Sequence, residues 1–144
     1  MIMDSTPLTT EQEAAVAILF ACALVKSQGL TQSRIEQLSR MLVLSSRFRD
    51  TSLNDLTVKA LSVNSEEGSK AIIEQYASVI SDDFKDTLFA MCCELLTDNG
   101  KIEDEESEIL AMTALYLGLT VENMRMMLTT YLIRNRWNVQ IIEQ

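Results

Sequence analysis

Histidine is absent from this 144-residue sequence, and proline, glycine and cysteine are scarce. Without histidine the chain lacks the commonest general base, the Ser–His and Cys–His nucleophile pairs, and the commonest transition-metal ligand. Its three cysteines are an odd number without metal-ligand spacing, which favours a reducing, cytoplasmic compartment. We therefore expect a cytoplasmic protein that is not an enzyme.

Long apolar runs are also missing. The longest, residues 14–25, falls short of the roughly 18–20 residues that span a bilayer. It follows Glu11 and Glu13 instead of basic residues, so it predicts a buried helix and not a signal peptide. With one proline and four glycines, the chain is expected to form a single compact domain of long elements over residues 1–144.

Positive charge is in short supply, since the net charge is −9. The deficit is concentrated in residues 98–108, which hold six acidic side chains and one lysine. An acidic chain repels phosphate backbones, so we expect no nucleic-acid partner. A protein partner is expected instead, with the chain itself a monomer or a homodimer.

Helix signals dominate what is present. Thr10 and Glu13 form a capping-box pattern that opens a helix to about Lys26, and Gly29 follows as a stop signal. No segment alternates with the two-residue period of a strand. The sequence predicts an all-α, compact bundle of seven to eight helices with tails at 1–9 and 137–144, and we expect Trp137 to pack back on the bundle. The remaining helices are expected at 31–44 (capped by Thr31), 53–63, 65–80 (capped by Ser65), 82–97 (capped by Ser81), 103–118 and 120–134 (capped by Thr120).

An internal repeat relates two of these helices. Residues 20–29 align without a gap with residues 91–100, and cysteine, leucine and glycine match in place. Each copy continues into another helix, so the alignment indicates two related hairpins about a pseudo-two-fold axis. Chance similarity between two amphipathic helices is the alternative.

The acidic stretch from Thr97 to Glu108 contains the candidate site. Its second half matches the spacing of a calcium-binding EF-hand loop, but Leu95 and Thr97 fall where that loop needs its first oxygen ligands. Two interpretations remain. The acids stabilise the start of a helix through its dipole, or they bind Ca²⁺ or Mg²⁺. The second interpretation assigns the cation to Asp98, Asn99, Glu103 and Glu106.

Other residues are candidates for contact with a partner. Asp104 and Glu105 add charge to the same turn, and Met126 is expected to be exposed because Met124 and Met127 fill the core side of the last helix. Cys22, Cys92 and Cys93 are expected in the core. An enzymatic alternative would pair Glu106 with Asp82 or Asp83 across the two hairpins.

The turn and the helix after it resemble the TerB-like domain of tellurite-resistance and related stress proteins. That family usually reads D-G-x-[IV]-x-x-x-E at the turn and L-G-[LI]-[ST] at the end of the helix. The resemblance implies a cytoplasmic, non-enzymatic bundle of seven or eight helices with a divalent-metal-linked sensing or scaffolding role, sometimes associated with membranes through partners. Asn99 stands where the family has aspartate, and Ser27, Gln28 and Arg34 occupy the first copy where acids are expected. The matching residues are Gly100, Ile102, Glu106, Leu117, Gly118, Leu119 and Thr120.

Overall fold

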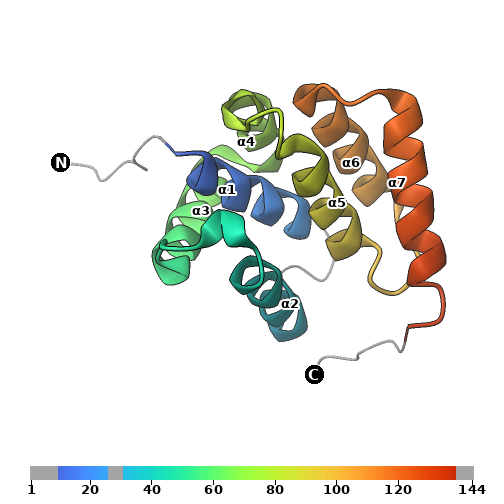
Figure 1. The fold of residues 1–144 in the computed structure, drawn as a ribbon, viewed down its shortest axis with the longest axis horizontal. Helices are drawn as coiled ribbons and strands as arrows, with labels where there is room; N and C mark the ends of the chain where they lie inside the picture. The colour runs from blue at the N-terminus through green and yellow to red at the C-terminus, as the bar shows by residue number, and fades with distance from the viewer. Residues whose placement is uncertain (1–9, 26–30, 139–144) are drawn as a thin grey trace.

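The computed structural model describes residues 10–25 and 31–138, and it is all-helical over these ranges (Figure 1). The predicted all-α bundle of seven to eight helices is confirmed, with seven α-helices in the described residues. No strand is present in the described part of the chain, nor does any helix there have the length and apolarity to cross a bilayer. The helices are α1 (Glu11–Ala23), α2 (Gln32–Val43), α3 (Leu53–Glu67), α4 (Ser69–Tyr76), α5 (Lys85–Leu96), α6 (Asp104–Leu117) and α7 (Val121–Arg134), with 3₁₀ turns η1 (Ser46–Phe48) and η2 (Ala77–Val79).

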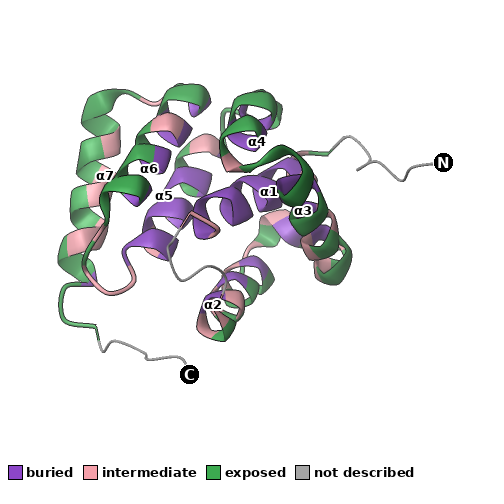
Figure 2. Cartoon of the chain, turned by 180° about the vertical axis from the view of Figure 1, so that it is seen from behind, coloured by how far each residue is buried: buried purple, intermediate pink, exposed green. Residues whose placement is uncertain are grey.

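Helix α1 is the centre of the core, and α3, α4, α5 and α6 pack around it (Figure 1). Every residue from Ala14 to Ala23 is buried, and Figure 2 shows α1 and most of α5 in the buried colour. The sequence permits this because small and apolar residues lie on all faces of the helix. The predicted capping box starts it, with the Glu13 amide 3.1 Å from Thr10 Oγ1 and the Thr10 amide 3.3 Å from Glu13 Oε1.

Two predicted helix starts were wrong. Ser65 does not cap a helix, because α3 continues to Glu67 and the chain turns at Gly68, whose φ is +85°. Ser81 does not cap α5, which begins four residues later at Lys85. The Ser81 hydroxyl donates to Asp83 instead, and the Ser81 amide donates to Glu11 at 2.6 Å. The contact of Ser81 with Glu11 joins residues seventy positions apart, which a local pattern does not contain.

Helix α7 forms the outer edge of the bundle, against α5 and α6 (Figures 1 and 2). None of its residues, all of which the structure describes, is fully buried. Met124, Met127, Leu128 and Tyr131 pack on the core as half-buried side chains. The predicted docking of Trp137 was wrong, since this side chain is 88% exposed. The remaining apolar residues of that tail, Ile141 and Ile142, lie outside the described residues.

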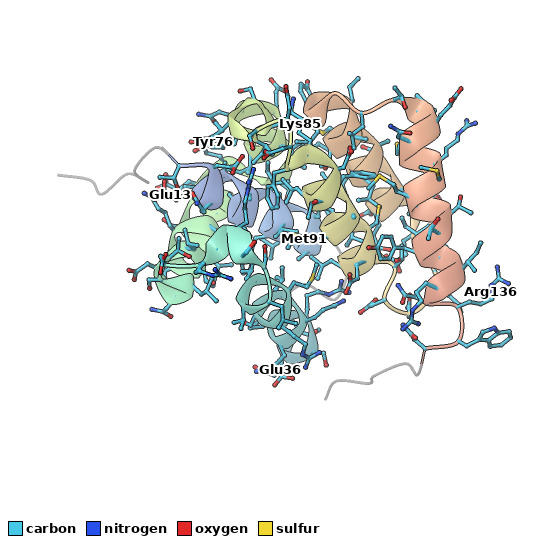
Figure 3. All side chains as sticks on the ribbon, in the orientation of Figure 1. Glu13, Glu36, Tyr76, Lys85, Met91 and Arg136 are labelled. Carbon is cyan, nitrogen blue, oxygen red and sulfur yellow. The ribbon has the colours of Figure 1, made fainter. Side chains whose placement is uncertain are left out.

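The turn between α5 and α6 packs on the end of α7. Gly100 has φ +78°, and a Cβ added there would lie 2.6 Å from the Arg136 Cα and 2.8 Å from the Asn135 carbonyl oxygen. Asn138 Nδ2 donates to the Asp98 carbonyl at 2.9 Å. Figure 3 shows Arg136 at the lower end of α7, beside this turn. Glycine is therefore required at position 100 for both its backbone conformation and this close approach.

We expect Gly100→Ala to destabilise the fold more than Gly118→Ala. Both glycines have positive φ, which costs alanine about 1–2 kcal/mol. Only at Gly100 would the new Cβ meet backbone, whereas at Gly118 it meets open space, so overpacking adds about 1–3 kcal/mol at Gly100 alone. Urea unfolding of the two variants measures this difference. Equal losses of stability would contradict the close packing of the turn on α7.

Candidate functional site

The acidic turn is closed by hydrogen bonds of its own. Gly100 N donates to the Thr97 carbonyl at 2.9 Å, and Lys101 N donates to Asn99 Oδ1 at 3.1 Å. Thr97 is buried, and its hydroxyl donates to the Cys93 carbonyl at 2.7 Å and accepts from Asn135 Nδ2 at 3.3 Å. The side-chain oxygen of Asn99 thus holds the turn, which is the local bond that asparagine typically makes in such turns.

Glu103 and Glu106 start helix α6 as a pair. Glu103 is the N-cap residue, and its amide donates to Glu106 Oε1 at 2.8 Å. This is the glutamate arm of a capping box. Glu106 is only 1% exposed, so its carboxylate is taken out of water as it caps the helix. The helix-start interpretation of these two acids is confirmed.

Arg34 is the residue of the acidic turn's surroundings whose burial the sequence interpretation missed. It lies in the first turn of α2, its side chain is 7% exposed, and its Nη2 is 3.5 Å from Asp98 Oδ2. Burial lowers the pKa of the Arg34 guanidinium, and the charges of Asp98 and Glu106 offset part of this effect. The sequence feature that could have indicated its burial is spacing. Arg34, Leu38 and Leu42 recur at four-residue intervals on the buried face of α2.

The four residues assigned to a cation therefore have other contacts. Asp98 and Glu106 lie around the Arg34 guanidinium, Asn99 holds the turn, and Glu103 begins α6. Within residues 10–25 and 31–138, no three histidine, cysteine, aspartate or glutamate side chains gather in an arrangement that could hold a metal ion. These contacts do not favour a divalent cation in the turn, and the assignment of a cation to these four residues stays a prediction.

The residues assigned to a partner are exposed, but they lie in two places. Asp104 and Glu105 are exposed in the first turn of α6, whereas Met126 is 61% exposed on α7. Met126 precedes the last residue of α7, Arg134, by eight residues, which places it about 12 Å along the helix from the end that packs on the acidic turn. The prediction that Met126 is the exposed methionine of its cluster is confirmed, since Met124 and Met127 pack on the core.

The carboxylates of the enzymatic alternative lie apart. Asp82 and Asp83 precede α5 and Glu106 follows it, so the twelve residues of this helix, about 18 Å, separate them. Asp83 pairs with Arg47 at 2.6 Å, and Asp82 pairs with Lys85 at 3.0 Å. Lys85 and Arg136 mark the two ends of this part of the bundle in Figure 3. The structure does not bring Glu106 to either aspartate.

The three cysteines are core residues, as predicted. All are fully buried, and Cys22 Sγ lies 3.7 Å from the Thr113 hydroxyl. A hydrogen bond with Cys22, together with burial, raises the pKa of Cys92. Burial and the neighbouring Cys22 raise the pKa of Cys93 to about 12. Thiols held protonated in this way are poor nucleophiles and poor metal ligands.

Comparison of the sequence with family models and with curated proteins gives no match, and no solved structure matches the fold.

We expect the cysteines to be unreactive toward a thiol reagent such as DTNB while the protein is folded, even at pH 9. An unfolded thiol ionises near pH 8.5, whereas the pKa of folded Cys93 is about 12. Unfolded chains therefore ionise first, so stability should fall as the pH rises from about 9 toward 12. Absorbance should show a slow native reaction and rapid labelling of three thiols in guanidinium chloride. A fast native phase would contradict the burial of the cysteines.

Proposed function

We propose that this chain is a non-catalytic, TerB-like stress-response module that binds a protein partner in the cytoplasm. The observation that carries the proposal is an apolar stripe along the outer face of α7 (the α7 stripe). It consists of Met126, Thr130 and Ile133 on the helix, together with Trp137 in the turn that follows the helix.

The α7 stripe has the spacing of a helix-docking face. Met126, Thr130 and Ile133 recur at intervals of four and three residues, which places them on one side of α7. Trp137 lies just beyond the end of this helix. Met126 is 61% exposed, Ile133 56% and Trp137 88%. The Thr130 hydroxyl donates to the Met126 carbonyl at 2.7 Å, so its hydrogen-bonding demand is met within α7. Exposed tryptophan and methionine at such spacing are typical of interface anchors.

Charge indicates the kind of partner. Arg125, Arg134 and Arg136 are exposed beside the α7 stripe, in a chain whose net charge is −9. Arginines around an apolar stripe complement an amphipathic helix that carries acids at its edges. The acidic turn lies against the chain at Arg136, and Asp104 and Glu105 follow it in the first turn of α6. Their negative charge would repel an acidic partner that docked in the wrong register. We therefore propose an acidic amphipathic helix as the partner.

A cation bound to Asp98, Asn99, Glu103 and Glu106 is the competing proposal for the acidic turn. It has less support, because the Asn99 oxygen is used in the turn and the Glu106 carboxylate caps α6. The alternative is a helical protein–protein adaptor with no metal site, and it agrees better with these contacts.

Site-specific photo-crosslinking tests the partner proposal. A photoreactive amino acid at position 126 or 133 should yield one discrete adduct with a different protein in cells that express the chain. The matched control is Val58 in α3, which is 60% exposed and thus presents a similar apolar side chain elsewhere. Position 58 should yield no such adduct. Equal adducts from all three positions, or an adduct only of two copies of this chain, would contradict the proposal.

Substitution of the α7 stripe should abolish the adduct without loss of stability. Met126→Ser and Ile133→Ser change exposed side chains, so each is expected to alter the free energy of unfolding by less than about 0.5 kcal/mol. Thermal melting checks this, and crosslinking from Trp137 in the double variant reads out binding. A strongly lowered melting temperature would show that the stripe serves the fold instead.

A further inference from the structure

We infer that the guanidinium of Arg34 is the resident cation of the acidic turn and takes the place that a bound divalent metal would occupy. The TerB-like resemblance implies a metal-linked role, whereas the contacts of this turn are made with a side chain of the same protein. The inference concerns the turn alone and is independent of the α7 stripe.

Three segments of the chain converge at this point. Arg34 comes from α2, Asp98 from the turn after α5, and Glu106 from the first turn of α6. The Arg34 side chain is 7% exposed and lies 3.5 Å from Asp98, whose side chain is 39% exposed. Glu106 is 1% exposed and attracts the same guanidinium. The positive charge thus reaches the acidic turn from the protein interior, while Asp98 faces water.

Burial explains why a positive charge is needed here. A carboxylate as deeply buried as Glu106 is strongly disfavoured unless an opposite charge and hydrogen bonds compensate it. The Glu103 amide supplies a hydrogen bond, and Arg34 supplies positive charge. Arg34 Nη1 is itself buried without a hydrogen-bond acceptor, so the guanidinium is held by charge and packing and not by a complete set of hydrogen bonds. A divalent cation placed between the same carboxylates would be repelled by it.

A covalently attached cation has a functional consequence. Calcium or magnesium would leave when their concentration falls, and the contact between α2 and the α5–α6 turn would then loosen. Arg34 cannot leave, so this contact is permanent and does not report the concentration of a divalent ion. The acidic turn therefore holds α2 against the α5–α6 turn at all times, and it is not a cation sensor.

Thermal melting in millimolar CaCl₂, in MgCl₂ and in EDTA tests the inference, with KCl added to match ionic strength. Wild type should melt at the same temperature in all three solutions. Arg34→Glu places a third carboxylate beside Asp98 and Glu106, so it should melt lower in EDTA and recover by about 3–10 °C in CaCl₂ or MgCl₂. Arg34→Gln, which adds no charge, is the matched control and should not recover.

Two outcomes would overturn the inference. One is a cation-dependent rise in the melting temperature of wild type that Glu106→Gln removes. The other is equal behaviour of Arg34→Glu and Arg34→Gln in calcium and in EDTA. If Arg34→Glu does not fold, a double-mutant cycle with Arg34→Gln and Glu106→Gln decides instead. The double variant should lose less stability than the two single losses added together, and strict additivity would contradict the pairing.

Discussion

Complete burial of α1 is the constraint on which the rest of the structure depends. A helix with no solvated face from Ala14 to Ala23 has to be covered from every side, and α3, α4, α5 and α6 provide that cover. These four helices surround α1, so α7 contributes no fully buried residue to the core. Helix α7 packs on α5 and α6 as an outer layer, with half-buried residues on one face and apolar residues left on the other. The α7 stripe is exposed because it lies on the face of α7 that points away from α5 and α6.

Two charged side chains lie inside the fold. The net charge of −9 stays at the surface for the most part, where water screens it, but Glu106 and Arg34 are drawn inside. Their proximity links α2 to the turn after α5 and to the start of α6. Removing one partner of such a buried pair typically costs about 3–5 kcal/mol, far more than a surface pair contributes. Arg34 is thus more important to the fold than any exposed acid of the turn.

Local patterns predicted the parts of the fold that local chemistry determines. The Thr10–Glu13 capping box, the left-handed Gly118 and the Thr120 cap were all predictable, because each depends on residues within one helical turn. The failures lie where distant residues decide. Ser81 bonds to Glu11 across seventy positions, so it does not cap α5.

Like the fold, the candidate site was predictable in its local features and not in its long-range contacts. Acids at a helix start and an exposed Met126 follow from composition and helical period, and both are observed. The role of Arg34 was harder to predict, because an arginine at the N-terminal end of a polar helix is normally solvated. Only its four-residue spacing with Leu38 and Leu42 marked it as an inward-facing residue. The exposure of Trp137 was also missed, since apolar tails commonly dock.

A crystal structure grown in the presence of calcium and magnesium chloride tests most directly whether the Arg34 side chain supplies the positive charge of the acidic turn. We expect the Arg34 guanidinium beside Asp98 and Glu106, with no ordered cation within about 2.0–2.6 Å of either carboxylate. A cation coordinated by both carboxylates, with Arg34 turned away from them, would contradict the account.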